Sequence, residues 1–386
     1  MATIVDTFTG ACVRLLQTRY WKAILTALLV SFSLFFAVPR FNYVLNASAD
    51  MGWQVVMQQR DASFLYQPTG VPPTSQAAKK TFRMTVPLVA KVLRLNALGI
   101  YGLQFLLGIL FVYLVIDFVQ TETGDRMTAA LFGIAFATLY VGRACFTDVY
   151  SRFEGWCYLL LFLSVYFRRW YLVFLFTFLA CWTDERALIG AAFAALWWLF
   201  RENGPDGMFN FKAVASKRYA AVVAAVLMYV AMRYVLQTRL GYYTPTAGVG
   251  FKYILYGFRY FNFGTWTFLE GLWIPVLYKF YLLLKHRHRA FFTVNLLVLA
   301  VAVVSSFVVF DITKSGSYVF ADALLALAVM ARYCEPARIR TVLGYAALVC
   351  FLFPPYFIIL DINPYILQQE SVPVIISKLI VKRYSL

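Results

Sequence analysis

The chain has 386 residues, of which 62% are hydrophobic and only 14% are charged, and its formal net charge is +17. Soluble globular proteins carry roughly 25% charged residues, so the composition excludes an ordinary water-soluble protein. Nucleic acid is not an expected partner, since that class of protein needs a soluble basic domain, which the sequence lacks. The basic residues instead stand beside apolar stretches, as in segments that face anionic lipid.

The apolar residues fall into about eleven stretches, most of them long enough to cross ~30 Å of hydrocarbon as a helix. Backbone polar groups must be satisfied inside the bilayer, which favours helices, and the stretches lack the alternation of barrel strands. We therefore predict an all-α, polytopic integral membrane protein with a single membrane domain over 1–386. The predicted spans are 20–38, 98–117, 128–145, 156–168, 170–182, 187–200, 219–237, 267–284, 291–310, 318–332 and 341–360.

The basic residues of the short loops predict the orientation of these spans. A cytoplasmic N-terminus places the main basic segments on one side of the membrane. They are Arg14, Arg19 and Lys22, then Arg168 and Arg169, Lys212 to Arg218, 285–289, and Arg332, Arg338 and Arg340. We therefore expect an inner (cytoplasmic) membrane protein of a bacterium, with its N-terminus in the cytoplasm.

Four of the predicted external turns carry acidic side chains, and most of them also carry a cation. The charged residues are Asp50 and Arg83 in the loop 39–97, then Asp148, Arg152 and Glu154, then Asp184, Glu185 and Arg186, and finally Asp311 and Lys314. Near the interface, beside a water-filled cavity, a charge costs far less than at mid-bilayer. We expect these turns to line one polar cavity that opens outward.

The turn "CWTDERALI" lies between the apolar runs "YLVFLFTFLA" and "GAAFAALWWLF". Solvated loops with local ion pairs are the alternative at each external turn. This turn, however, is very tight, and its flanking spans look too short to lift Asp184, Glu185 and Arg186 clear of the membrane. We therefore expect these three residues to form a wall of the site.

The outer face offers carboxylates, cations and aromatic rings, but no histidine. Both histidines, His286 and His288, fall in a predicted cytoplasmic loop, so acyl transfer through a His-activated nucleophile is not expected. The outer-face residues suit transfer of a sugar from a lipid-phosphate donor. A carboxylate can take the proton of an acceptor hydroxyl, and Arg and Lys can bind the phosphate leaving group.

These residues resemble the GT-C glycosyltransferases, polytopic enzymes that use polyprenyl-phosphate sugars on the external face. Asp50 in "NASAD" matches the catalytic acid of their first external loop, which is followed by interfacial helices that "RMTVPLVAKVL" resembles. The segment "FTDVYSRFEGW" is similar to a second acidic motif, and "TDERALI" to the turn between spans five and six. The chain departs from the family because Asp50 has no adjacent second acid and no large C-terminal soluble domain follows.

The resemblance covers 15–200, which it implies is the shared catalytic module, and 201–386 would complete the donor and acceptor cavity. Asp50 is then the expected general base of an inverting transfer. The other expected roles are: Asp148 and Glu154 as acceptor- or metal-binding acids; Arg83, Arg152, Arg186 and Lys314, with Arg143 as a weaker candidate, as phosphate binders; Asp184, Glu185 and Asp311 as supporting acids; and Tyr242, Tyr243, Tyr256, Tyr260 and Trp266 as acceptor lining.

The expected partners are a polyprenyl-phosphate-linked sugar and membrane lipids. A divalent cation, Mg²⁺ or Mn²⁺, can bind where two carboxylates converge, although a monophosphate donor needs no metal in principle. Three alternatives stay open: a transporter or flippase of a lipid-linked or anionic substrate, a surface-polysaccharide polymerase or ligase that uses a diphosphate donor, and a non-catalytic scaffold. Transporters usually show internal repeats and Gly- or Pro-broken spans, and neither is evident in the sequence.

Overall fold

The computed structural model describes residues 13–62, 78–207, 216–242, 250–309, 311–353, 357–359, 365–367 and 372. Within these ranges the fold is helical, except for an antiparallel hairpin of β1 (Phe357–Ile359) and β2 (Tyr365–Leu367). Each predicted span overlaps at least one helix, although the span 341–360 also includes β1. The prediction of a helical membrane protein is therefore confirmed.

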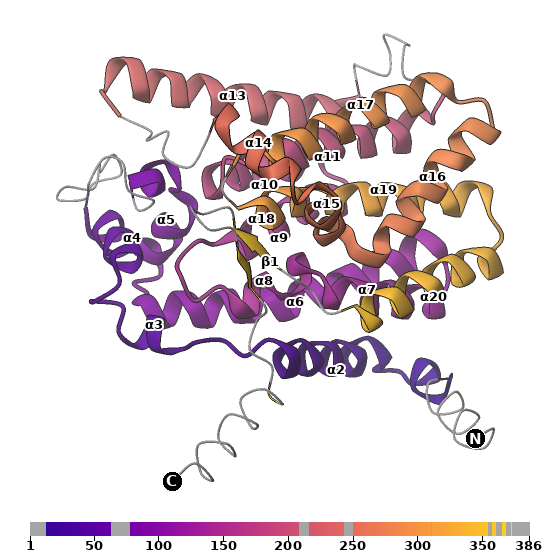
Figure 1. Ribbon diagram of the computed structural model, residues 1–386, viewed down its shortest axis with the longest axis horizontal. Coiled ribbons are helices and arrows are strands. Elements are labelled where there is room, and N and C mark those ends of the chain that lie inside the picture. Colours follow the sequence, from indigo (N-terminus) through magenta and orange to yellow (C-terminus); the bar gives the residue numbers. More distant parts are fainter. Residues whose placement is uncertain are drawn as a thin grey trace.

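The first part of the chain combines one apolar helix with a group of short helices. Helix α2 (Trp21–Phe36) packs along α6 and α7 at the lower edge of Figure 1. The short helices that follow gather at one end of the bundle in that view: α3 (Asn42–Leu45), α4 (Met51–Asp61), η1 (Ala78–Phe82) and α5 (Thr85–Val92). Asp50 begins α4, because its side chain accepts a hydrogen bond of 2.9 Å from the Trp53 amide.

The next six helices form the part of the bundle that carries the charged turns. They are α6 (Ala97–Thr123), α7 (Arg126–Thr138), α8 (Tyr140–Thr147), α9 (Glu154–Tyr166), α10 (Trp170–Thr183) and α11 (Ala187–Asn203). Helix α6 begins at the Asn96 cap and ends at Gly124, whose φ of +69° only glycine adopts easily. Helices α7 and α8 form a pair that bends by 58°.

The remaining helices include the buried helix α19, which contacts α6, α11, α15, α16 and α20. In chain order they are α13 (Lys217–Arg239), α14 (Phe251–Phe258), α15 (Phe261–Leu269), η3 (Glu270–Leu272), α16 (Trp273–Lys285), α17 (Arg289–Ser306), α18 (Ile312–Gly316), η4 (Ser317–Val319), α19 (Phe320–Tyr333) and α20 (Pro336–Leu352). Helix α13 packs on α10 and α11, α16 packs on α19, and α20 packs on α7.

Several of these helices are long and apolar enough to cross a membrane. By length and composition, five stretches of the described chain qualify: 97–123, 217–239, 261–285, 289–306 and 312–333, and the bent pair α7–α8 would make a sixth. Helices α2, α9 and α10 are apolar but shorter. The full set of about eleven spans therefore stays a prediction.

The start of α9 is fixed by its contact with α8. Gly155, the second residue of α9, leaves no room for a side chain, since a Cβ there would lie 2.6 Å from the Cys145 amide nitrogen. The two helix backbones therefore touch directly, which holds Glu154 at the base of the charged turns.

Candidate functional site

Asp184 lies at the centre of an ion network rather than in a solvated loop. Its side chain is fully buried. Asp184 Oδ1 accepts hydrogen bonds of 2.9 Å from both the backbone N and Nε of Arg186, and Arg83 Nη2 lies 3.2 Å from its Oδ2. The two guanidinium groups outweigh the effect of burial and lower the pKa of Asp184. The contacts of Asp184 with Arg83 and Arg186 therefore stabilise the turn between α10 and α11, with its charged groups buried.

Glu154 joins three segments that are far apart in the sequence. Its carboxylate is buried, and Oε1 accepts hydrogen bonds from Arg186 Nη2 at 3.2 Å and from Lys314 Nζ at 3.1 Å. Oε2 has no hydrogen-bond partner within the described part of the chain. Arg186 also donates to Ser315 Oγ at 3.4 Å. These contacts dock α18 onto the first turns of α9 and α11.

Asp148 organises the loop between α8 and α9. Its Oδ1 accepts from the Tyr150 amide at 3.2 Å and its Oδ2 from the Phe153 amide at 2.6 Å. The loop needs this support because Ser151 and Phe153 adopt φ values of +56° and +63°, which L-residues rarely adopt. Burial, followed by the nearby charge of Glu154, raises the pKa of Asp148 to about 6.

Asp50 lies next to this loop because Trp53 anchors its helix there. The buried Trp53 ring donates from Nε1 to the Val149 carbonyl at 2.8 Å. A Cβ on Gly52, in the first turn of α4, would lie 2.9 Å from Asp50 Oδ1, 2.9 Å from Ser151 Oγ and 2.7 Å from Lys80 Nζ. The three polar atoms therefore surround one point, and the structure brings Asp50 to the charged turns.

Lys80 is a member of the site that sequence analysis missed. Only 7% of this residue is exposed, and its ammonium group donates to Ser151 Oγ. Burial, followed by repulsion from Arg83, lowers its pKa to about 7, while Asp148 and Asp50 act in the opposite direction. In the sequence, Lys80 is one of two adjacent lysines in a long polar loop, a pattern typical of solvated residues.

Arg152 and Asp311 form the most open ion pair of the cluster. Arg152 Nη1 lies 3.5 Å from Asp311 Oδ2, and the two side chains are 38% and 24% exposed. Arg83 donates to the Arg152 carbonyl at 3.2 Å and lies 3.8 Å from Glu185 Oε2. Among the predicted phosphate binders, Arg152 therefore has the most solvent contact, whereas Arg83 and Arg186 are held by Asp184.

The structure describes the side chains of three of the five residues predicted as aromatic lining, Tyr242, Tyr260 and Trp266. Tyr242 is buried with its ring centroid 6.1 Å from that of Phe82, at the end of η1. Tyr260 immediately precedes α15, and Trp266 within α15 makes an edge contact with Phe353, with ring centroids 5.8 Å apart. Tyr243 and the side chain of Tyr256 lie outside the described residues.

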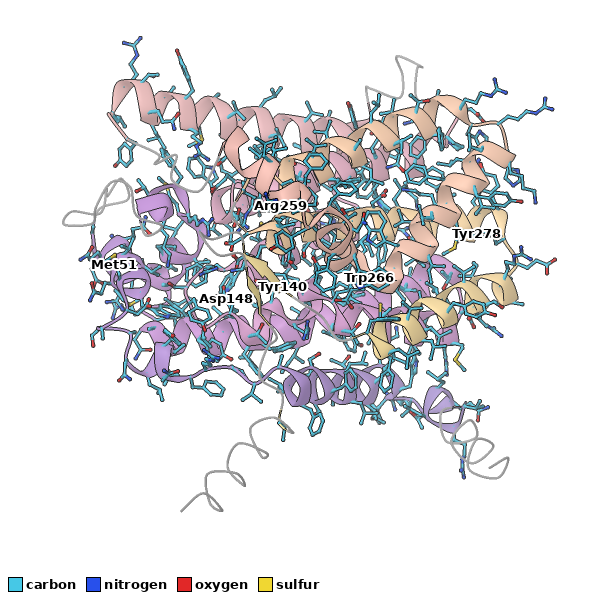
Figure 2. The ribbon with its side chains drawn as sticks, in the orientation of Figure 1. Met51, Tyr140, Asp148, Arg259, Trp266 and Tyr278 are labelled. Carbon is cyan, nitrogen blue, oxygen red and sulfur yellow. The ribbon has the colours of Figure 1, made fainter. Side chains whose placement is uncertain are left out.

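Arg143 lies deeper in the bundle than the other cations. It is buried in α8 and interacts electrostatically with Glu270, at the start of η3, and with Tyr140. Tyr140 in turn interacts with Glu154 and Asp148, and Figure 2 shows Tyr140 and Asp148 close together. Tyr140 therefore connects Arg143 with the charged turns.

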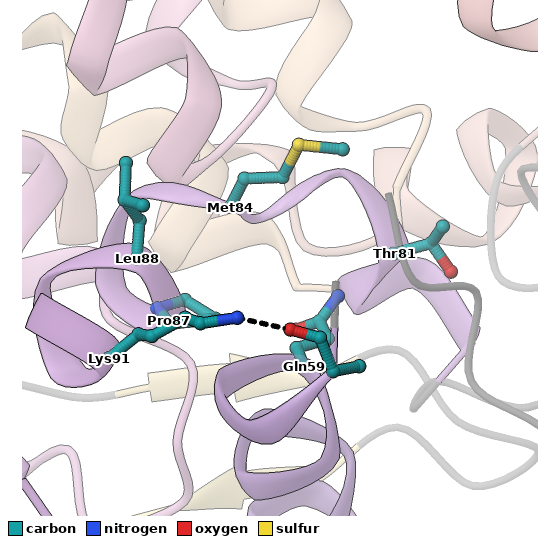
Figure 3. Close-up of a pocket in the computed structure, with 7 residues that line it drawn as sticks. Gln59, Thr81, Met84, Pro87, Leu88 and Lys91 are labelled. Atoms are coloured by element: carbon teal, nitrogen blue, oxygen red, sulfur yellow. Dashed lines mark hydrogen bonds between the residues drawn. The ribbon is translucent and has the colours of Figure 1, made fainter. Parts of the chain in front are cut away.

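A small cavity of about 170 Å³ lies beside the segment that carries Lys80 and Arg83 (Figure 3). Its lining residues are Gln59, Ala62, Thr81, Met84, Pro87, Leu88 and Lys91. Gln59 donates to the Lys80 carbonyl at 2.9 Å, and Lys91 donates to the Ala62 carbonyl. The cavity thus has an apolar wall from α5 next to the polar cluster.

No three His, Cys, Asp or Glu side chains come together as metal ligands within the ranges that the structure describes. Binding of Mg²⁺ or Mn²⁺ therefore stays a prediction. Comparison of the chain with protein-family models, curated proteins and solved structures finds no match. The function has therefore to be inferred from the side chains of the site.

Proposed function

We propose that this protein is an inverting membrane glycosyltransferase of the GT-C kind. It would move a sugar from a polyprenyl-phosphate donor to a glycan, lipid or other acceptor on the external face of the membrane. One observation carries this proposal: cations and carboxylates from four separate segments, 80–83, 148–154, 184–186 and 311–314, converge at one place. Such a cluster suits a substrate that carries a phosphate and reacts at a hydroxyl group.

The contacts suggest that some cations hold the charged turns together and others bind the phosphate. Arg83 and Arg186 are tied to Asp184, so their expected role is to hold the turns together. Arg152 is partly exposed, and its ion pair with Asp311 is 3.5 Å long. Lys80 donates to the Ser151 hydroxyl and forms no ion pair with a carboxylate among the described residues. We therefore assign the leaving phosphate to Arg152 and Lys80, whose charges would stabilise it as the bond breaks.

Asp50 remains the preferred general base. It is partly exposed, and its Oδ2 makes no hydrogen bond to the described residues, whereas both oxygens of Asp148 accept backbone amides. In the proposed step, the acceptor oxygen bonds to the anomeric carbon while the bond from that carbon to the phosphate oxygen breaks. Asp50 takes the acceptor proton, and polyprenyl phosphate leaves.

The cavity of Figure 3 is suited to the lipid end of the donor. Met84, Pro87 and Leu88 give it an apolar side, and Lys80 and Arg83 are neighbours of its lining residues in the sequence. A polyprenyl phosphate presents this combination of an apolar chain next to a charged group.

A transporter or flippase is the second candidate, and one observation favours it. The pair α7–α8 bends by 58°, and the stretch 261–285 contains Glu270 at a φ of +47°, so two potential spans are irregular where they carry Arg143 and Glu270. Broken spans with buried polar groups are typical of transporters. Proteoliposomes separate the two functions, since a transporter moves its lipid-linked substrate without forming a glycosidic bond.

Replacement of Asp50 tests the proposed base without removing the helix cap. Asparagine caps a helix about as well as aspartate, so Asp50→Asn should keep the fold. Loss of a general base lowers a rate by about 10²- to 10⁴-fold. We expect that loss in sugar transfer from a panel of polyprenyl-phosphate sugars, with donor binding retained.

Asp61→Asn is the matched control, because Asp61 ends the same helix, is 62% exposed and pairs with the neighbouring Arg60. This variant should transfer sugar at the wild-type rate. Full activity in Asp50→Asn would refute the role of Asp50 as the base.

A further inference from the structure

A second polar cavity lies at the opposite end of the same helices. It has a volume of about 280 Å³ and is lined by Asp117, Phe118, Thr121, Glu122, Val165, Tyr166, Phe167, Arg168, Trp197, Trp198 and Arg201. Glu154 begins α9 and Arg186 precedes α11, whereas the lining residues come from the last turns of α6, α9 and α11 and from the linker after α9. The cavity is therefore a helix length away from the proposed transfer site.

The carboxylates of this cavity are partly satisfied by the protein. Asp117 accepts from Lys22 at 2.6 Å and from the Tyr166 hydroxyl at 2.9 Å. Glu122 Oε2 lies 2.5 Å from Arg201 Nη1, and its side chain is only 6% exposed. Glu122 Oε1 makes no hydrogen bond to the described residues, so one acceptor is left for a cationic ligand group.

The cavity also holds donors that lack an acceptor. Trp197 is 98% buried, and its indole N–H has no hydrogen-bond partner within the described ranges. By contrast, the neighbouring Trp198 donates to the Ser164 carbonyl at 3.0 Å. The exposed guanidinium of Arg168 forms no ion pair with any carboxylate that the structure describes. A buried N–H without a partner is costly, and an anionic oxygen would satisfy both groups.

The lining residues include two carboxylates, Asp117 and Glu122, and two guanidinium groups, Arg168 and Arg201, while Lys22 pairs with Asp117 from outside the lining. A purely anionic ligand would meet the Glu122 carboxylate, and a purely cationic one would meet the guanidinium groups of Arg168 and Arg201. Phe118, Val165 and the two tryptophans add apolar walls to the cavity. The lining therefore fits a ligand with both charges on a small polar group that is attached to an apolar body.

We propose that this cavity binds the headgroup of a zwitterionic phospholipid with a primary ammonium group, of the phosphoethanolamine type. The phosphate would accept from Arg168 and Trp197 Nε1, and the ammonium group would donate to Glu122. This site is independent of sugar transfer and lies on the face that the basic loops assign to the cytoplasm.

Native mass spectrometry of the full-length protein with added lipids tests this proposal. The probes are phosphatidylethanolamine, phosphatidylcholine, phosphatidylglycerol and the deacylated glycerophosphoethanolamine. Phosphatidylethanolamine should bind most tightly, and Arg168→Gln should weaken it about tenfold, as expected for one lost charge-assisted hydrogen bond. Trp197→Phe keeps an aromatic ring but removes the N–H, and should weaken the same lipid several-fold.

Arg169→Gln is the matched control, because Arg169 is the adjacent exposed arginine, contacts Tyr171 and does not line the cavity. It should bind phosphatidylethanolamine like the wild type. Equal binding of phosphatidylglycerol and phosphatidylethanolamine, or equal losses in Arg168→Gln and Arg169→Gln, would overturn the proposal. Equally tight binding of glycerophosphoethanolamine would overturn the assignment to a lipid.

Discussion

Glu154 shows how much of the site depends on single side chains. One buried oxygen of this residue accepts hydrogen bonds from both Arg186, which precedes α11, and Lys314 of α18. The three residues are far apart in the sequence. The charges of these turns and their position at span ends were predictable from sequence, because they interrupt apolar runs. Their pairing was not, since any of the turns could have formed local ion pairs.

Lys80 and Asp50 illustrate two different limits of sequence reasoning. Nothing distinguishes Lys80 from its neighbour Lys79 until the fold buries it against Ser151. Asp50 is a candidate site residue because of its position after the first predicted span, and the structure adds that its side chain caps α4. Whether its carboxylate acts as a base stays a prediction.

The pKa values of Asp148 and Lys80 predict the pH dependence of transfer. Asp148 is ionised above about pH 6, and Lys80 keeps its proton below about pH 7. If the loop needs the Asp148 carboxylate and the phosphate needs the Lys80 ammonium group, the rate should peak between these two values. Arginine stays protonated at higher pH than lysine. In the Lys80→Arg variant, the alkaline limb of the pH–rate profile should therefore shift to higher pH. An unchanged alkaline limb would exclude Lys80 from phosphate binding.

The positions of the helices were predictable from the sequence, but the bends and breaks within them were not. Each apolar stretch predicts a helix because its length and composition suit one. The bend between α7 and α8 has no such signal, because the run "LFGIAFATLYVG" is continuously apolar. In three dimensions, Gly142 lies so close to the Phe136 carbonyl that a side chain would collide with it. Close approaches of this kind depend on the packed structure.

The contact between α8 and α9 gives a prediction about stability. Gly155→Ala would push a methyl group to within 2.6 Å of the Cys145 amide, and overpacking of this kind costs about 1–3 kcal/mol. Gly102→Ala in α6 is the control, since no atom lies within 4 Å of its Cβ position. The control should be neutral or slightly more stable, because alanine favours a helix. Thermal unfolding in detergent measures both, and equal stability of the two variants would contradict the packing.

A buried ion pair connects α16, α17 and α19. Lys279 donates to Asp322, and Asn295 Nδ2 donates to the same oxygen at 3.0 Å, with all three side chains buried. Asp322→Asn leaves a buried ammonium group without its counter-ion and should cost about 3–5 kcal/mol. The double variant Lys279→Met with Asp322→Leu should recover most of that loss in the same unfolding assay. If the double variant were less stable than Asp322→Asn, the pair would have a role beyond charge compensation.

At the scale of the whole molecule, the two ends of the helices have different chemistry. The short helices α3 to α5 gather at one end of the bundle (Figure 1), and the second polar cavity lies at the last turns of α6, α9 and α11. The orientation expected from the basic loops, with a cytoplasmic N-terminus, stays a prediction. The number of spans was less predictable, because α2, α9 and α10 are apolar but too short to show by themselves whether they cross the membrane.

The central claim is that the converging turns bind the phosphate of a polyprenyl-phosphate donor. An experimental structure of the protein in lipid nanodiscs with a polyprenyl monophosphate tests it most directly. We predict that the phosphate lies within hydrogen-bonding distance of Arg152 and Lys80, on the side of the Asp50 carboxylate. A lipid phosphate bound away from every cation of the cluster, with the Arg152–Asp311 pair intact, would contradict the claim.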